Sequence, residues 1–269
     1  MDHRDPPTRY THGHTEPVLR SHRWRTADNS AGYLLPHLRP GLRLLDVGAG
    51  PGTITADLAE LVGPGTTSAL EQTEDAIALT RAELERRGLS GVTCLVGDVH
   101  ALELADGSVD VVHAHQVLQH VTDPVTALRE LLRVTAEDGV VAARDSDYSA
   151  FTWYPRSTLL DEWLDLYLRV ARGNGGEPDA GRHLHAWARE AGASAVEPST
   201  STWLYAGEEA DWWGRLWADR VVEGRFAEDA RRLGATDRDL GRIADGWRAW
   251  AASPDAWFCL LHGEVLARP

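Results

Sequence analysis

A composition of 43% hydrophobic and 25% charged residues in a chain of 269 is ordinary for a globular protein, and it excludes a disordered chain or a fibre. The net charge of −14 makes nucleic acids and anionic membranes poor electrostatic partners. All 27 basic residues are arginine, so no lysine can form a Schiff base. The two cysteines, Cys94 and Cys259, provide neither a disulfide framework nor a thiolate zinc site.

The N-terminal segment lacks the apolar core of a secretory signal, and no apolar run approaches the ~18 residues that a membrane span needs. We therefore expect a cytoplasmic protein, monomeric or homodimeric, without a membrane or nucleic-acid partner. The preference for arginine and alanine is typical of a GC-rich bacterial genome.

Residues 1–23 show no hydrophobic period and predict an arm, and 27–38 predict a helix that Pro36 ends or kinks. Short apolar segments then alternate with helical ones. Strands are expected at 42–47, 66–71, 91–96, 109–114 and 139–144, and helices at 54–62, 74–87 and 124–136. Such alternation predicts a parallel sheet that helices cover on both faces.

Beyond residue 148 the composition changes, because ten of the eleven tryptophans lie between Trp153 and Trp257. They either fill the core of a helical layer or line a cavity for an organic ligand, and the sequence leaves both open. A helix is expected at 181–191. Two strands, 194–205 and 256–267, are expected to pair as a hairpin at the sheet edge, with a helical insertion folded over the site.

Together these elements predict a core domain with additional segments that are inserted into it and cover the site. The plan comprises an N-terminal arm and helix over the site at 1–40, the core at 41–147, a cap segment at 148–180, a core helix and strand at 181–207, a helical cap insertion at 208–253 and the last core strand at 254–269. The run 173–182 holds four glycines and is either a hinge of the cap or a plain surface loop.

The stretch LLDVGAGPGTIT, residues 44–55, carries the most informative motif. It places Gly48, Gly50 and Gly52 between a strand and a helix, where glycine permits a sharp turn and close approach of a ligand to the backbone. The helix N-terminus behind them offers N–H groups to an anionic group. The spacing is G-x-G-x-G, and Thr53 stands where a dinucleotide fingerprint has its third glycine.

Acidic residues end the next two strands. Glu71 lies 21 residues after Gly50, where a carboxylate can accept both hydroxyls of a ribose. Asp98 ends the third strand and can bond an adenine amino group. The fourth strand, 109–114, then runs into a short turn. With Glu71 and Asp98 at these positions, a ligand-binding loop is favoured over a plain strand-to-helix turn.

In this order and spacing, the motifs resemble the class I S-adenosylmethionine-dependent methyltransferases, most closely the UbiE-like (type 11) branch that acts on small molecules. The resemblance covers residues 40–145 well, and 181–205 and 255–267 more loosely. It implies a Rossmann-like α/β fold with a seven-stranded, mostly parallel sheet of order 3-2-1-4-5-7-6 and an antiparallel last strand. It also implies S-adenosyl-L-methionine as cofactor and S-adenosyl-L-homocysteine as product.

By this resemblance the cofactor contacts five segments of the chain. The implied contacts are Trp24 and Arg25 of the N-terminal segment, Gly48, Ala49 and Gly50 of the glycine loop, Glu71 and Gln72, Asp98 and Val99, and His115 and Gln116. Glu71 stands where Asp is more usual in the family, and Ala49 where Cys is common.

Methyl transfer from a sulfonium requires mainly alignment and exclusion of water, and a general base only where the acceptor arrives protonated. His115, Asp145 and Tyr148 are the catalytic candidates, because they follow the fourth and fifth strands, where ligands collect in such sheets. His113 is expected to be a core residue. No third ligand with suitable spacing completes a metal site, so no metal is expected.

We therefore expect a methyltransferase for a small, partly hydrophobic molecule of secondary metabolism or detoxification, with a thiol as acceptor, since a thiolate needs little help from a base. Two alternatives stay open. A protein of the same fold can bind the cofactor and catalyse a cyclisation, or serve as a binding module. The other is an NAD-linked oxidoreductase, against which the missing third glycine argues.

Overall fold

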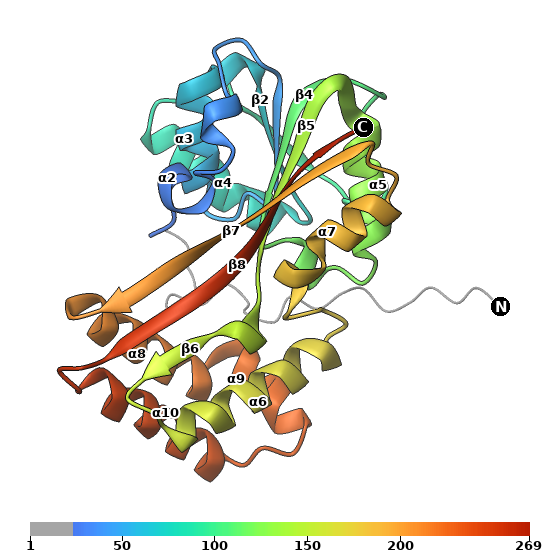
Figure 1. Cartoon of the computed structure of the whole chain (residues 1–269). Coiled ribbons are helices and arrows are strands. Elements are labelled where there is room, and N and C mark those ends of the chain that lie inside the picture. The colour runs from blue at the N-terminus through green and yellow to red at the C-terminus, as the bar shows by residue number, and fades with distance from the viewer. Residues whose placement is uncertain (1–23) are drawn as a thin grey trace.

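The computed structural model describes residues 24–269. Its centre is a single sheet of eight strands, which Figure 1 shows running through the whole molecule. The strands are β1 (Leu44–Val47), β2 (Thr67–Glu71), β3 (Thr93–Val96), β4 (Val109–His115), β5 (Thr135–Ser146), β6 (Thr152–Tyr154), β7 (Ala195–Ala206) and β8 (Trp257–Arg268). Their order is β3-β2-β1-β4-β5-β8-β6, and β7 pairs with the other edge of β8.

This order confirms the expected fold. The strands expected sixth and seventh are β7 and β8, so the predicted order 3-2-1-4-5-7-6 is present, and β8 is antiparallel to β5 as expected. The eighth strand is an addition, because β6 pairs with the start of β8. The sequence does not predict β6, since three residues are too few to show strand alternation.

Neighbouring strands from β3 to β5 are all parallel, so their carboxyl ends lie at one edge of the sheet. The four residues of β1 are all buried, as befits a central strand with helices on both faces. Ligands of open parallel sheets bind beyond this edge, at the point where the strand order reverses. Here that point lies between β1 and β4.

Helices cover both faces of the upper sheet in Figure 1. On one side lie α2 (Ala27–Ser30), α3 (Thr53–Val62) and α4 (Glu74–Arg86), and on the other α5 (Pro124–Val134) and α7 (Ala180–Glu190). The helix expected over 27–38 is wrong in extent. It ends at Ser30, and a 3-10 turn follows at Leu35–His37, where Pro36 has no N–H with which to continue a helix.

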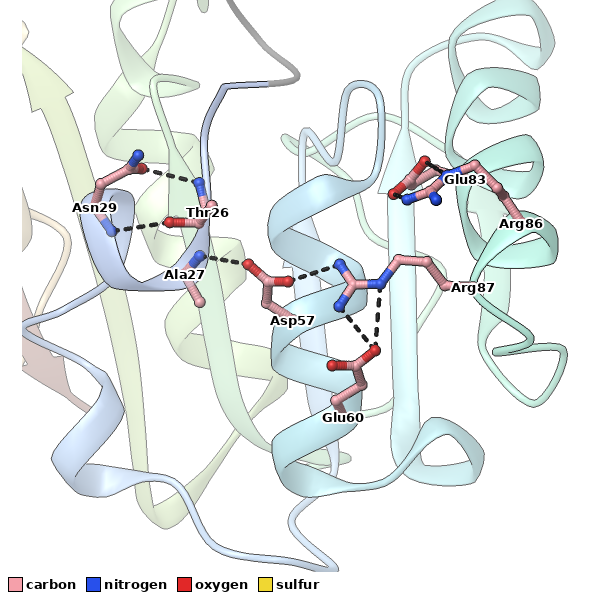
Figure 2. A network of polar contacts seen from close by, with 8 residues as sticks. All are labelled: Thr26, Ala27, Asn29, Asp57, Glu60, Glu83, Arg86 and Arg87. Carbon is pink, nitrogen blue, oxygen red and sulfur yellow. Dashed lines mark hydrogen bonds and ion pairs between the residues drawn. The ribbon is translucent and has the colours of Figure 1, made fainter.

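The short helix α2 is tied to α3 and α4 by one carboxylate, which Figure 2 shows. Asp57 accepts the backbone N–H of Ala27 at 2.8 Å through one oxygen and a guanidinium N–H of Arg87 at 2.7 Å through the other. Arg87, just beyond the end of α4, also pairs with Glu60 at 2.7 Å. The start of α2 is therefore fixed to α3 and to the end of α4.

A second helical layer lies at the lower end of the sheet in Figure 1, where β6, β7 and β8 extend beyond the other strands. It consists of α6 (Thr158–Gly173), α8 (Glu208–Val222), α9 (Gly224–Arg232) and α10 (Asp237–Ala251), and we call it the cap. Its centre is aromatic, and Trp163, Trp217 and Trp247 are at most 1% exposed. The ring of Trp163 meets Trp217 at 4.6 Å and Trp247 at 4.8 Å, both edge to face. These tryptophans fill the core of a helical layer.

The turn after β4 is held in place from β5. The carboxylate of Asp145 is fully buried and accepts the backbone N–H of Gln119 at 3.1 Å, within the 3-10 turn Leu118–His120. Burial raises the pKa of this carboxyl to about 8, against the opposing effect of the backbone N–H groups of Gln119 and Leu118. Asp145 therefore holds the 3-10 turn that carries His120 against β5.

The aromatic centre of the cap predicts a large loss of stability when Trp163 is truncated. We expect Trp163→Ala to lower the free energy of unfolding by about 3–5 kcal/mol, since it removes a fully buried ring and leaves a cavity. Urea unfolding followed by circular dichroism measures this change. Trp257→Ala is the control, because Trp257 is 38% exposed and its loss should cost less than about 1 kcal/mol. Equal effects of the two changes would contradict this account of the cap.

Buried Asp145 predicts a specific pH dependence of stability. The carboxyl loses its proton near pH ~4 in the unfolded chain but only at about 8 in the folded one, so it makes stability fall as pH rises between these values. Asp145→Asn keeps an oxygen acceptor for Gln119 and cannot ionise. The melting temperature of the variant relative to wild type should therefore rise by several degrees from pH 5 to pH 8.

Differential scanning calorimetry across this pH range provides the measurement. The matched control is Asp138→Asn, an exposed aspartate on the same strand, which should follow the wild type at every pH. An Asp145→Asn protein whose melting temperature stays parallel to that of the wild type would show that Asp145 ionises normally.

Candidate functional site

A cavity of about 670 Å³ lies at the carboxyl ends of β1, β2 and β4. Most of its lining comes from the strand ends and the turns that follow them. Two arginines reach it from elsewhere: Arg25 precedes α2, and Arg225 belongs to α9 of the cap. The core therefore forms most of the cavity, and the cap contributes Arg225 to its lining.

The glycine loop forms one wall of the cavity. Gly48 has φ +69°, and a Cβ there would lie 2.5 Å from Cγ2 of Val117, so the loop packs directly on the turn after β4. Gly50 has φ +57°, and a Cβ there would meet no atom within 4 Å. Since Gly50 lines the cavity, its missing side chain leaves the backbone open to a ligand.

Glu71, at the end of β2, faces the same loop. Its carboxylate accepts the backbone N–H of Gly50 at 2.6 Å and that of Gln72 at 3.3 Å. Burial raises the pKa of Glu71, and these two N–H groups oppose the rise. Asp98 accepts the backbone N–H of His100 at 2.9 Å and contacts its ring nitrogen at 2.7 Å. Both carboxylates line the cavity, so this end of it is acidic.

His115, the last residue of β4, has its tautomer set by Arg144 on β5. A guanidinium nitrogen of Arg144 lies 3.5 Å from Nδ1 of His115, and a guanidinium can only donate. Burial, with the positive charge of Arg144 next, holds the pKa of His115 well below its usual range. The neutral ring therefore carries its proton on Nε2, which has no partner among residues 24–269. His115 presents a hydrogen-bond donor, rather than a base, for a ligand.

Gln116 joins the site to three other segments. Its side-chain oxygen accepts from Arg25 at 2.7 Å, and its amide nitrogen donates to Ser146 at 2.8 Å and to His262 at 3.0 Å. Its φ of +55° is the one positive value for a non-glycine residue in the described chain. Such backbone strain persists where the surroundings impose it, which is common at functional sites.

A second buried histidine, His113, forms a dyad that the sequence did not single out. Its Nδ1 lies 2.7 Å from Asp46, whose other oxygen accepts the hydroxyl of Thr55 at 2.5 Å. A carboxylate only accepts, so Nδ1 carries the proton and Nε2 keeps a lone pair. Nε2 has no partner among the described residues, and both members of the dyad line the cavity. The signal that could have revealed this dyad is the adjacency of β1 and β4 in the sheet, which pairs Asp46 with His113.

The structure brings nearly all predicted cofactor contacts together. Those that line the cavity are Arg25, Gly48, Ala49, Gly50, Glu71, Gln72, Asp98, Val99, His115 and Gln116. Trp24 lies elsewhere, packed on Trp203 at 5.3 Å and on Tyr205 at 5.5 Å.

Of the three catalytic candidates, only His115 lines the cavity. Asp145 lies behind it in the turn contact described above, and the ring of Tyr148 stacks on Tyr167 at 4.0 Å in the aromatic centre of the cap. Tryptophan is also absent from the cavity lining within the described chain.

Residues 24–269 contain no group of three or more His, Cys, Asp or Glu side chains arranged to hold a metal ion. No helix in this part of the chain has both the length and the apolar character needed to cross a membrane.

A family model described as a methyltransferase domain matches residues 38–192, more than half of the chain. An uncharacterised methyltransferase of Schizosaccharomyces pombe is 32% identical over 96% of this chain and 95% of its own. The ubiquinone/menaquinone biosynthesis C-methyltransferase UbiE of a Shewanella strain is 30% identical over 48% of this chain and 50% of its own.

Solved structures share the fold at lower identity. The YcgJ protein of Bacillus subtilis superimposes with a TM-score of 0.58 at 17% identity, covering 88% of this chain and 96% of its own. A phosphoethanolamine N-methyltransferase of Haemonchus contortus, in complex with S-adenosylhomocysteine, gives 0.53 at 14% identity over 86% and 50%. The fold, the glycine loop with its facing carboxylates and these matches agree: the chain belongs to the class I S-adenosylmethionine-dependent methyltransferases of the UbiE-like type.

Proposed function

We propose that this methyltransferase acts on a small, partly hydrophobic molecule, that the acceptor atom is a thiol sulfur, and that the reaction belongs to secondary metabolism or detoxification. The observation that carries the proposal is the cavity itself, whose lining includes the glycine loop, Glu71 and Asp98 and also His113, His115, Gln116 and the cap residue Arg225. The glycine loop and the carboxylates suit the cofactor, and the remaining volume suits an acceptor of limited size.

The cofactor end fits S-adenosylmethionine on two counts. Gly50 leaves its backbone open toward the cavity, and the carboxylate of Glu71 has two backbone donors as partners, which leaves lone pairs for the two hydroxyls of a ribose. We propose that Glu71 and Gln72 hold the ribose side, Asp98 and Val99 the adenine side, and Gly48 to Gly50 the methionine part. When bound, this cofactor supplies an electrophilic methyl group on a positively charged sulfur.

The chain's own part is then to align the acceptor, exclude water and handle one proton. The cap contributes Arg225 of α9 to the lining of the cavity. His115 offers its Nε2–H as a donor. His113 is the better base, because Asp46 holds the proton on Nδ1 and leaves Nε2 with a lone pair.

A thiol is favoured as acceptor because it needs the least help from a base. Thiols ionise near physiological pH, so a thiolate can enter the cavity without a base, whereas an alcohol or phenol must lose its proton within it. The cyclisation and binding-module alternatives predict bound cofactor without its consumption, so release of S-adenosylhomocysteine separates them from methyl transfer.

Removal of the Glu71 carboxylate should weaken cofactor binding. We expect Glu71→Gln to lower the affinity for S-adenosylhomocysteine about 10- to 100-fold in calorimetric titration, since hydrogen bonds to a charged group contribute about 1.5–3 kcal/mol each. Glu85→Gln, an exposed position on α4, provides the matched control and should bind as wild type does. A parallel titration with NAD should give no heat. Binding of NAD in place of S-adenosylhomocysteine would contradict the assignment.

The identity of the acceptor atom can be tested with a matched pair, thiophenol and phenol. We expect wild-type protein to methylate the thiol faster. His113→Gln should slow phenol methylation by about 100-fold or more and thiol methylation by less than about 10-fold, because the phenol needs the base. Release of S-adenosylhomocysteine, followed by mass spectrometry of the products, is the readout. A wild-type preference for phenol would argue against S-methylation, and equal losses on both acceptors would remove His113 as the base.

A further inference from the structure

Charge is unevenly distributed around the cavity. The carboxylates of Glu71 and Asp98 lie at the end assigned to the ribose and adenine, and the third acidic residue of the lining, Asp46, is paired with His113 and Thr55. The arginines, Arg25 and Arg225, come from the N-terminal segment and the cap. In a chain with a net charge of −14, two arginines in the lining of the cavity suggest that the cavity binds an anionic group.

Arg225 differs from its neighbours on α9. Arg231 forms an ion pair with Asp237 at 2.8 Å, and Arg232 pairs with Asp229, so these two are neutralised on the surface. Arg225 is half-buried, lines the cavity and has no hydrogen bond or ion pair to any residue of 24–269. Its guanidinium therefore has five donors available to a ligand.

The cofactor does not account for both arginines. S-adenosylmethionine carries one carboxylate, which its own ammonium group already offsets. Arg25 is bound to Gln116 at 2.7 Å, and Gln116 adjoins Val117, on which the glycine loop packs. Arg25 is thus the arginine nearer to the methionine end, and Arg225, on the cap side, is left for the acceptor.

We propose that the acceptor carries an anionic group, a carboxylate or a phosphate, and that the guanidinium of Arg225 binds it. This inference rests on the proposed function, since it assigns one end of the same cavity to the acceptor. A planar guanidinium suits both anions, because its parallel N–H groups match their oxygens. The acceptor is then an amphipathic molecule whose charged group contacts the cap and whose apolar part faces Val117 and Val121.

The test measures binding, so it does not depend on knowing the natural acceptor. Benzoate and phenyl phosphate, with benzamide as the neutral partner, are titrated calorimetrically into protein saturated with S-adenosylhomocysteine. We expect wild type to bind at least one anion more tightly than benzamide. Arg225→Gln should weaken that anion about 10-fold or more and leave benzamide unchanged. Arg238→Gln, an exposed arginine of the cap with the same loss of charge, should behave as wild type.

Three results would overturn the inference. The first is no preference of wild type for either anion over benzamide, and the second is an equal loss of anion affinity in Arg225→Gln and Arg238→Gln. The third is weakened binding of S-adenosylhomocysteine itself in Arg225→Gln, which would place Arg225 at the cofactor. A wild-type protein that binds no S-adenosylhomocysteine would instead contradict the proposed function, and the same anions titrated into cofactor-free protein would still report on Arg225.

Discussion

Most of the site depends on the contacts of one buried group, the guanidinium of Arg144. It is 1% exposed, contacts Glu264 at 3.2 Å, donates to Ser201 at 3.0 Å and lies 4.8 Å from the ring centre of Trp203. Strand register places His115, Arg144 and Glu264 side by side on β4, β5 and β8. A buried charge is tolerated only with such partners, and loss of one partner typically costs about 3–5 kcal/mol. This row of three residues therefore holds β4, β5 and β8 in register and also sets the tautomer of His115.

The same row connects the core with the cap. Trp203, on β7, has its ring beside the guanidinium of Arg144. Its indole N–H donates to the backbone oxygen of Asn29, within α2, at 2.6 Å. Its ring also meets Trp24 and lies 5.4 Å below the guanidinium carbon of Arg25. Trp24 and Arg25 are thus packed on a residue of β7, and the chain enters the cap where β7 ends. A displacement of Trp203 by either the core or the cap would move Arg25, and through Arg25 it would move Gln116.

Local sequence signals determine the cofactor end, and this explains what could be predicted. The glycine loop and Glu71 follow strands whose apolar runs are unambiguous, and the parallel sheet brings their ends together without further information. The Asp46–His113 dyad was missed because it depends on the pairing of β1 with β4, and the contact of Trp24 with Trp203 joins residues 179 positions apart. The tryptophans of the cap gave no periodic signal that separates a packed core from a lined cavity.

Arg225, like the Asp46–His113 dyad, is placed by tertiary packing and not by a local sequence signal, and this has a consequence for specificity. No motif surrounds it, since α9 is short and polar, and only the packing of the cap brings it to the cavity. The residues proposed to bind the cofactor stand at strand ends, whereas Arg225, proposed to bind the acceptor, stands on a helix of the cap. By these proposals, substitutions in the cap change the preference for the acceptor while the glycine loop and Glu71 stay intact. This separation explains how a recognisable cofactor motif can accompany an acceptor that the motif does not reveal.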